Sequence, residues 1–270
     1  NHVPMSQVGA TLATAGDLNN DGATDLLLTA PGFSEDIQGG GVVYSVEGSL
    51  LLWSSNADYD LRYNVGVMKG IEEGEQLGTS LDSSIDISGD ENIDTIVGSP
   101  GARQGAGLAT IFTMVPGYVH DRENGVHIIG TPFSAAGTTL ASVGDVDGDA
   151  KGDVLIGGTH TAWFLQGPLN QDAFLGRDED ATLHADAPIS AMTRVGDING
   201  DGLADILIGS EARSQAWLLL DPPHGTVTLD SEAITLSLQD GAATPVGAAL
   251  AGTGDTNGDG YADLLIGSPT

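Results

Sequence analysis

Cysteine is absent from this sequence of 270 residues, and basic and aromatic residues are scarce. Without cysteine the chain has no disulfide, no thiolate zinc site and no cysteine nucleophile. Only 8 lysines and arginines stand against 38 acidic residues, which gives a formal net charge of −30. Nucleic acids and anionic membrane surfaces require positive charge on a partner, so we expect neither to be bound. A cation or a basic surface is the more natural counterpart, although acidity outside the motifs below also fits a gain in solubility.

Long apolar runs are also missing. No run approaches the roughly 20 residues of a membrane-spanning helix, and no leader with basic and apolar parts is present. We therefore expect no membrane insertion and, for a secreted protein, a signal that has already been removed. Glycine, in contrast, is abundant at 40 residues, and few stretches favour helix. This composition predicts an all-β protein with many short strands and tight turns, large enough for one big domain or two smaller ones.

One acidic motif occurs five times along the chain. The copies read GDLNNDGATDLLLTAPG (16–32), IDISGDENIDTIVGSPG (85–101), GDVDGDAKGDVLIGG (144–158), GDINGDGLADILIGS (196–210) and GDTNGDGYADLLIGSP (254–269). Their first aspartates are 69, 59, 52 and 58 residues apart, so the repeated unit has about 60 residues. A run of four or five apolar residues follows each motif. Runs this short predict fully buried strands rather than helices.

Each unit shows further strand patterns in a constant order. A small and apolar strand precedes the motif, at 8–16, 77–85, 138–144, 189–196 and 247–254. A third strand follows at 41–46, 108–114, 161–166 and 215–221, and a weaker fourth near 50–53, 126–130, 181–184 and 226–236. Units of four buried strands predict blades around an axis, which is a β-propeller; a β-solenoid is the alternative, but its repeats are usually half as long. The tryptophans Trp53, Trp163 and Trp217 are expected in the core between blades.

The count of units is incomplete for a ring. The sequence holds about four and a half blades, and residues 1–7 could add at most one short strand. We expect one propeller region over 1–270, centred on acidic loops at 17–25, 86–94, 145–153, 197–205 and 255–263, as part of a larger ring.

The acidic loops carry oxygen-bearing side chains at alternate positions. Numbered from the first aspartate, positions 1, 3, 5 and 9 are Asp17, Asn19, Asp21, Asp25; Asp86, Ser88, Asp90, Asp94; Asp145, Asp147, Asp149, Asp153; Asp197, Asn199, Asp201, Asp205; and Asp255, Asn257, Asp259, Asp263. The backbone carbonyl of position 7 is a further candidate ligand, in Ala23, Asn92, Lys151, Leu203 and Tyr261. Position 6 requires a sharp turn, which Gly22, Gly202 and Gly260 allow, while Glu91 and Ala150 depart from glycine.

Converging carboxylates need a cation. Two of them ~4 Å apart repel by on the order of 4 kcal/mol at an effective dielectric near 20. An all-oxygen ligand set in a flexible loop favours Ca²⁺ over Mg²⁺, and the absence of His and Cys from all five loops disfavours zinc. An EF-hand is excluded because its position-12 glutamate is replaced by Leu28, Val97, Ile156, Ile208 or Ile266. Plain Asp/Asn/Gly turns without metal are the alternative, but five copies in register favour up to five calcium ions.

The repeated pattern G-D-x-[ND]-x-D-G-x-x-D, followed by apolar residues and then G-[AS]-P, resembles the FG-GAP repeats of integrin α-subunit β-propellers and their bacterial relatives. GEQLGTSL (74–81) is similar to the FG part, with Leu77 in place of Phe, and APG (30–32), SPG (99–101) and SP (268–269) to the GAP part. The third and fourth repeats lack the proline. The resemblance implies a calcium-bearing propeller, extracellular or on a cell surface, that acts in adhesion or recognition.

No catalytic motif is found, so we expect no enzymatic activity. GTSLD (78–82) is not a nucleophile elbow, the histidines lie singly, and the acidic run 178–180 is better explained as a solvated face than as a glycosidase pair. Glycine-rich QGGG (38–41) and GAGL (105–108) are expected to be strand entries.

Recognition is expected on the loops opposite the acidic ones. The candidates are Phe33, Glu35 and Asp36 in 32–40, Arg103 and Gln104 in 101–106, Arg213 in 210–214, and Tyr59, Arg62 and Tyr63 in the insertion 54–70, which could instead cover a blade edge. The partner is expected to be another protein, a surface glycan, or further parts of the same parent chain or assembly. Three functions remain open: a binding or adhesion module, a carbohydrate-binding or carbohydrate-processing propeller, and a purely structural component of a surface assembly.

Overall fold

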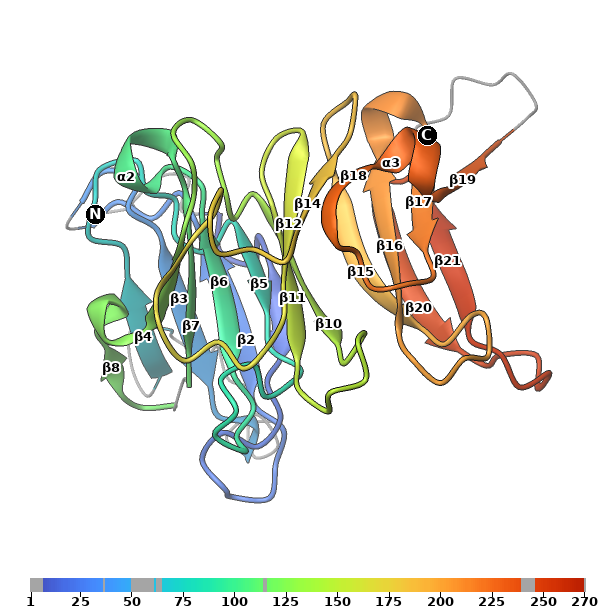
Figure 1. The fold of residues 1–270 in the computed structure, drawn as a ribbon. Helices are drawn as coiled ribbons and strands as arrows, with labels where there is room; N and C mark the ends of the chain where they lie inside the picture. The colour runs from blue at the N-terminus through green and yellow to red at the C-terminus, as the bar shows by residue number, and fades with distance from the viewer. Residues whose placement is uncertain are drawn as a thin grey trace.

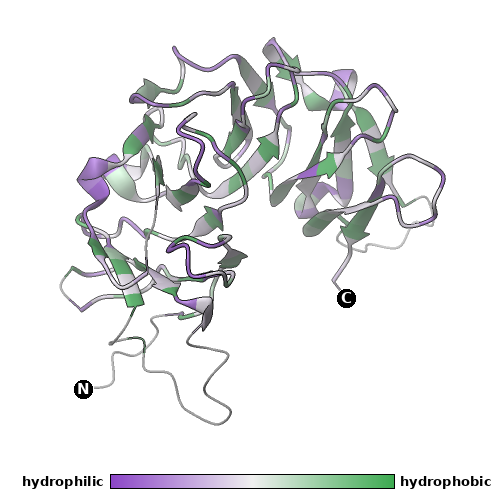
Figure 2. Ribbon diagram, turned by 90° about the horizontal axis from the view of Figure 1, so that it is seen from below, coloured by the Kyte–Doolittle hydropathy of each residue, from purple (hydrophilic) through white to green (hydrophobic). Residues whose placement is uncertain are grey.

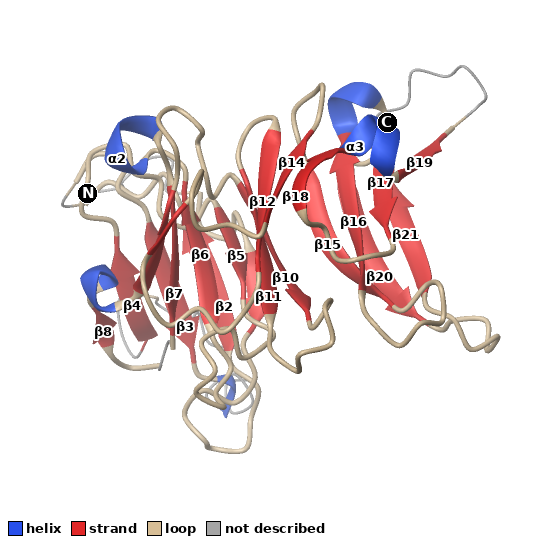
Figure 3. Cartoon of the chain, viewed as in Figure 1, coloured by secondary structure: helices blue, strands red, loops and turns tan. Residues whose placement is uncertain are grey.

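A computed structural model describes residues 7–35, 37–49, 61, 65–113, 116–238 and 246–269. These residues form a succession of antiparallel sheets joined by loops, with only short helical turns (Figure 3). Seen from below, the sheets follow one another along an open arc, with apolar strands and polar loops (Figure 2). The fold is therefore all-β, as predicted, and it is a partial β-propeller rather than a solenoid.

Three blades contain four antiparallel strands in chain order, and their bounds follow. The first blade has β1 (Leu12–Thr14), β2 (Leu26–Ala30), β3 (Val42–Val46) and β4 (Val65–Lys69). The second has β5 (Ser80–Asp82), β6 (Thr95–Ser99), β7 (Leu108–Phe112) and β9 (Val126–Ile129). The third has β10 (Thr139–Gly144), β11 (Asp153–Gly157), β12 (Thr161–Leu165) and β14 (Ala181–His184).

The arc continues with a fourth blade and half of a fifth. The fourth blade has β15 (Ala191–Gly196), β16 (Asp205–Ser210), β17 (Gln215–Leu219) and β19 (Ile234–Ser237). The fifth sheet has two strands, β20 (Ala249–Gly254) and β21 (Asp263–Gly267). The predicted four and a half blades are thus present, and the first, second and third strands of each unit were placed correctly.

A fifth strand extends each of the first three sheets and was not predicted. The segment between the third and fourth strands of one blade reaches back and pairs in parallel with the fourth strand of the preceding blade. These strands are β8 (Val119–His120) on β4, β13 (Ala173–Phe174) on β9 and β18 (Gly225–Thr228) on β14. We call β8, β13 and β18 the strap strands, because each ties a blade to the one before it.

Two fourth-strand predictions need correction. In the first blade the fourth strand is β4, which the sequence analysis had included in an insertion, while residues 50–53 lie outside the described residues. The stretch 226–236 contains two separate elements, because β18 belongs to the sheet of the third blade and only β19 to the fourth. The short helix α3 (Leu229–Glu232) separates them.

The core is divided into layers between successive blades. First strands of neighbouring blades lie side by side, as in β10, β15 and β20. The second strands β6, β11 and β16 are buried along their whole length, as predicted from their apolar runs. Trp163 and Trp217 are 4% and 0% exposed and belong to the cores between blades, which confirms that prediction, whereas Trp53 lies outside the described residues.

Glycines allow the close approach of neighbouring blades at one end. Gly209 in β16 lies against the backbone of Gly247, so that a Cβ on Gly209 would lie 2.3 Å from the Gly247 carbonyl oxygen. Gly98 in β6 meets Gly137 of the next blade in the same way, at 2.0 Å. Glycines near the end of a second strand and glycines just before the first strand of the next blade therefore let the two backbones come into contact. We call these contacts the joints between blades.

Candidate metal-binding loops

The five acidic loops lie at the same end of the blades, each between the first and second strands (lower end in Figure 1). In the last three units a β-bulge precedes the loop, at Gly144, Gly196 and Gly254, which all have a positive φ. The bulge twists the first strand where it enters the loop. This geometry explains why glycine precedes the first aspartate.

The aspartate at position 1 accepts backbone hydrogen bonds from the turn that follows it. Asp197 Oδ1 accepts from the amides of Gly200 (2.6 Å) and Asp201 (3.1 Å), and Oδ2 from Gly202 (2.9 Å). Asp17, Asp86, Asp145 and Asp255 also accept from the amides of positions 5 and 6. The same side chain therefore organises all five turns, and it does so from the interior of the loop.

Positions 3 and 5 are tied to each other. The position-5 aspartate accepts from the amide of position 7 in every loop, as Asp201 does from Leu203 at 2.8 Å. Where position 3 is asparagine, its Oδ1 accepts from the position-5 amide and its Nδ2 donates to the position-5 carboxylate, at 2.8 Å for Asn199 and Asp201. The hydrogen bond from the Leu203 backbone amide, and then that from the Asn199 side chain, lower the pKa of Asp201.

The position-9 aspartate is the buried member of each set. Asp25, Asp94, Asp153 and Asp205 are 0–2% exposed, whereas Asp263 in the half blade is partly exposed. Burial raises the pKa of Asp153 to about 6, against favourable hydrogen bonds from Val146 and Gly167. It also raises the pKa of Asp94 and of Asp205. In the half blade, hydrogen bonds from Thr256 lower the pKa of Asp263 instead.

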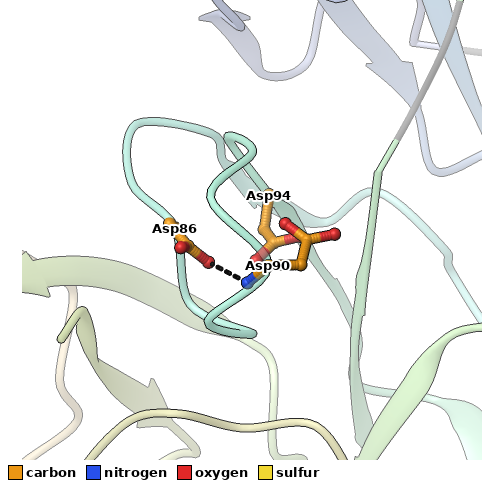
Figure 4. Close-up of side chains that lie close together, drawn as sticks. All are labelled: Asp86, Asp90 and Asp94. Carbon is orange, nitrogen blue, oxygen red and sulfur yellow. Dashed lines mark hydrogen bonds between the residues drawn. The ribbon is translucent and has the colours of Figure 1, made fainter.

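Carboxylates converge in two of the loops. Ligand oxygens of Asp86, Asp90 and Asp94 all lie within 4.8 Å of one another, and the three side chains face the inside of one loop (Figure 4). Asp145, Asp147 and Asp149 form a second such group. The second loop, with its unusual glutamate at position 6, thus brings its acids together as closely as the third. Elsewhere in the described residues no trio of acids meets this distance, so the aspartates at positions 1, 5 and 9 of the first, fourth and fifth loops converge less closely than those of the second loop.

The turn at position 6 is left-handed in all five loops, as predicted for the glycines. Gly22, Gly202 and Gly260 have φ between 87° and 93°, and Glu91 and Ala150 adopt 70° and 66°. Position 4 has a positive φ too and was missed by the sequence analysis. Its residues are Asn20, Gly89, Gly148, Gly200 and Gly258, and the signal was visible as glycine or asparagine in every copy.

The donor set fits a hard divalent cation. All candidate side-chain ligands are oxygens, and no hydrogen bond to the position-7 carbonyl oxygens is found within the described residues. Asp205 adds a buried carboxylate oxygen, Oδ1, that has no hydrogen-bond partner. The equivalent oxygens of Asp25 and Asp153 accept from Gly48 and Gly167 at 2.9 and 3.0 Å. The fourth loop therefore has an unused acceptor beside its loop oxygens.

The candidate recognition loops lie at the opposite end of the blades (upper end in Figure 1), and loop 101–106 contains the short helix α2 (Ala102–Gly105). Arg103 and Gln104 adopt a left-handed backbone there, and Arg213 pairs with Asp230 at 3.4 Å. Phe33 lies under the ammonium group of Lys69, which also pairs with Glu35 at 3.2 Å. Asp36, Tyr59, Arg62 and Tyr63 lie outside the described residues.

One exposed aromatic residue at this end was missed. Phe133 is 86% exposed, has a φ of 62° and lies in the loop whose Ala135 donates to the Gly105 carbonyl oxygen of α2. The acidic run 178–180 lies largely exposed, as predicted, and Asp178 and Glu179 also accept hydrogen bonds from the amides of Phe174 and Gly176 beside strap strand β13.

A cavity of about 850 Å³ opens beside β3 and β4. Its lining combines the aromatic residues Phe33 and Tyr44 with the acids Glu35 and Asp121. Burial raises the pKa of Tyr44. No helix in the described part of the chain is both long and apolar enough to cross a membrane.

Comparisons with known proteins match two parts of the repeat array. Residues 8–46 match the FG-GAP repeat, and residues 197–266 match the FG-GAP-like repeat. Over these two stretches the chain is similar to FG-GAP repeats. Integrin alpha-PS2 of Drosophila melanogaster is 29% identical over 157 residues, a match that covers 49% of this chain and 11% of the integrin. These matches confirm the FG-GAP and integrin α-like resemblance predicted from the motifs.

The fold comparison is consistent with this result. A chain in a structure of ctPRC2 aligns with a TM-score of 0.50 and 11% identity, over 96% of the chain described here and 45% of that chain. At this identity the likeness concerns the fold alone. The matches span about a tenth of the integrin and less than half of the ctPRC2 chain.

Proposed function

We propose that the chain is a calcium-stabilised propeller region, comprising residues 1–270, that acts as a binding module in an adhesion-type protein outside the cell. The observation that carries the proposal is the fivefold acidic hairpin with one hydrogen-bond scheme. The matches to FG-GAP repeats and to an integrin α subunit support an adhesion-type module. No catalytic step is assigned to it.

Calcium would be held by positions 1, 3, 5 and 9 together with the carbonyl of position 7. Two carboxylates 4.8 Å apart repel by about 3–4 kcal/mol at an effective dielectric near 20. A divalent cation removes that repulsion while the backbone amides keep the turn in shape. Each site lies within one hairpin, so the ions would stiffen the blades rather than switch them.

Isothermal titration calorimetry of the calcium-free chain tests the metal. We expect up to five calcium ions per chain and weaker binding of magnesium, whose small octahedral shell tolerates these loops poorly. Differential scanning calorimetry should show a melting temperature higher in calcium than in EDTA, because each site contributes about 2.7 kcal/mol at a calcium concentration 100 times its Kd. Equal melting in calcium and in EDTA would refute calcium stabilisation.

The binding face is proposed at the end opposite the acidic loops, around Phe133, Arg103 and Gln104. An exposed aromatic ring beside an arginine is typical of an interface centre. Cells should attach to a surface coated with the chain, and Phe133→Ala should reduce attachment without lowering the melting temperature. As a matched control, Phe174→Ala removes an exposed ring (43% exposed) that lies on strap strand β13. Equal attachment to all three proteins would place the binding face elsewhere.

Carbohydrate binding is a second candidate, because the cavity beside β3 and β4 combines aromatic rings with acids. Sugars pack on aromatic faces while carboxylates accept from their hydroxyl groups. A glycan array probed with the chain and with Tyr44→Ala decides this point: binding that is lost in the variant supports it. A chain that binds neither cells nor glycans would favour a purely structural component of a surface assembly.

A further inference from the structure

The connection after the third strand of the first blade reaches the first acidic loop. It begins with Glu47, Gly48 and Ser49, directly after β3. The Gly48 amide donates to Asp25 Oδ1 at 2.9 Å. A hydrogen bond with the Ser49 side chain is the largest of the causes that lower the pKa of Asp21. Two candidate ligands of this loop are therefore held from outside the loop as well as from within it.

Glu47 makes a third contact of this kind, with the asparagine at position 3. Asn19 Nδ2 donates to the half-buried Glu47 at 2.8 Å and to Asp21 Oδ2 at 3.1 Å, while Asn19 Oδ1 accepts from the Asp21 amide at 3.0 Å. A carboxylate without a proton can only accept hydrogen bonds, so Glu47 binds the NH2 end of the Asn19 amide. The oxygen end, which is the end that can bind a cation, is thereby kept toward the loop.

The contact with Glu47 also changes the asparagine as a ligand. An amide oxygen is a neutral donor, whereas the third loop has the carboxylate of Asp147 at the same position. Hydrogen bonds in a chain polarise one another, so a carboxylate that accepts from the amide nitrogen makes the amide oxygen a stronger donor to a hard cation. Glu47 is also a fourth carboxylate beside the three aspartates of the first ligand set, and calcium affinity depends on the number of ligand charges.

The fourth loop has the same residue types at positions 1, 3, 5 and 9 but lacks this partner. Tyr44 and Trp217 pair with equivalent residues of their second strands, so Leu220 takes the place of Glu47 in the fourth unit. There Asn199 Nδ2 donates to the Leu220 backbone carbonyl oxygen at the longer distance of 3.4 Å. Among the four third strands of the described chain, an acid follows at this place in the first unit alone.

We propose that Glu47 is a positioning residue of the first calcium site. It holds the Asn19 side chain with its oxygen toward the loop, and it adds negative charge without being a ligand itself. This role rests on the proposed calcium binding by the loops, and it assigns to one site a residue outside the repeated motif. Loss of such a partner typically weakens metal binding about 10- to 100-fold.

The first test measures calcium affinity loop by loop in the whole chain. Hydrogen exchange is followed at increasing free calcium, with residues 17–25 and 197–205 as separate reporters. In Glu47→Gln the calcium midpoint of 17–25 should rise about 10-fold or more, because glutamine has no charge and can present either end of its own amide to Asn19. The midpoint of 197–205 should not change. Glu73→Gln, the matched control, removes the same charge from an exposed residue at the other end of the blades and should move neither midpoint.

A second measurement needs no metal. In NMR spectra of the calcium-free chain, the side-chain NH2 signals of Asn19 should shift in Glu47→Gln, because the bond to a charged acceptor is lost. The corresponding signals of Asn199 should stay in place, since the fourth loop has no contact with Glu47.

The reverse exchange can be made in the fourth loop. Leu220→Glu places a carboxylate beside Asn199 and should lower the calcium midpoint of 197–205. The comparison is with Leu220→Gln, which loses the same apolar side chain and gains a side chain of the same size without the charge. Any effect of the lost leucine on folding is therefore common to both variants.

The outcomes separate this role from calcium binding as such. No protection of any loop by calcium would refute calcium binding, and the role of Glu47 with it. Protection of both loops with an unchanged midpoint of 17–25 in Glu47→Gln would refute the role of Glu47 alone, and so would unmoved Asn19 signals. Equal shifts in Glu47→Gln and Glu73→Gln would show that net charge, and not the contact with Asn19, sets the affinity. A fourth loop that binds calcium no more tightly in Leu220→Glu than in Leu220→Gln would also overturn the proposal.

Discussion

The ninth residue of each acidic loop joins two parts of its blade. Asp153 Oδ2 accepts from the amide of Val146 at 3.0 Å, which closes the loop, and Oδ1 accepts from Gly167, just after the third strand. Asp25 does the same with Leu18 and Gly48. The carboxylate is therefore a structural group even without a metal, and it is buried at a cost in solvation.

That cost makes stability depend on pH. Burial raises the folded-state pKa of Asp153 to about 6, above its unfolded value of 3.8, so the native state binds more protons than the unfolded state between these values. In EDTA, the contribution of Asp153 to stability should be fully present below about pH 4 and lost as pH rises through 6, by at most about 3 kcal/mol. The nearby Asp147 and Asp149 act in the same direction.

Thermal melts of the wild type and of Asp153→Asn between pH 4 and 7 check this prediction, since all other groups titrate in both. The melting temperature of the wild type in EDTA should fall relative to that of the variant as pH rises. With calcium present, the melting temperature of the wild type should instead rise relative to that of the variant as pH rises, because protons and metal compete for the same oxygens. A constant difference between the two proteins across this range would contradict the prediction.

Ala150 in the third loop has a strained, left-handed backbone conformation, with a φ of 66°. Glycine adopts that conformation without the penalty of about 1–2 kcal/mol that a Cβ brings, although it adds entropy to the unfolded chain. Ala150→Gly should therefore stabilise the chain by about 0.5–1 kcal/mol in urea denaturation. Ala233→Gly, at an ordinary φ of −102°, should destabilise it. The same sign for both variants would rule out backbone strain at Ala150.

At the scale of elements, the contacts between blades depend on glycines, whose lack of a side chain lets two backbones approach closely. A Cβ at Gly209 would lie 2.3 Å from the Gly247 carbonyl oxygen, closer than real contacts allow, so β16 or β20 must shift. Gly209→Ala should cost roughly 2–4 kcal/mol in chemical denaturation, as overpacked sites do. Gly202→Ala is the matched control, because it has a φ of 91° but open space, and should cost only about 1 kcal/mol. Equal losses would show that the joint tolerates a methyl group.

The sequence predicted the elements whose signal is local. Each second strand is an apolar run directly after an acidic loop, and each loop carries its own turn residues. The strap strands have no such signal, since they are two to four residues long and pair with residues 44–52 positions earlier. The fourth strand β4, VGVMK, was hidden because its partner Tyr44 and the strap residue Val119 decide its place, and neither is near it in sequence.

The site was predictable to a similar degree. Alternate spacing within one hairpin predicted positions 1, 3, 5 and 9 as ligands, and the described residues bring three acids within 4.8 Å of one another in the second and third loops. The contacts of Asp25 with Gly48 and of Asp153 with Gly167 were not predictable, because they depend on where the third strand ends. Phe133 was missed for the same reason: its exposure results from how its loop meets α2.

For the whole molecule, charge and architecture are linked. Five bound calcium ions would bring the formal charge from −30 to −20, all at one end of the blades. Because each loop belongs to a single hairpin and neighbouring loops share no predicted ligand, the sites should bind calcium independently. Interactions between separated sites are usually additive.

Removing one ligand therefore tests whether the five sites act as one unit. Asp205→Ala deletes the buried carboxylate whose Oδ1 has no partner in the structure, and it should lower the calorimetric calcium stoichiometry by one while the remaining sites keep their affinity. Asp186→Ala, which removes an acid with an 80% exposed side chain outside the loops, should leave the stoichiometry unchanged. An unaltered stoichiometry in Asp205→Ala would remove that residue from the ligand set. A loss of all sites together would show instead that calcium binding depends on the assembled arc. If each site is formed by its own hairpin, the loss of one site should leave the structure and the affinity of its neighbours unchanged.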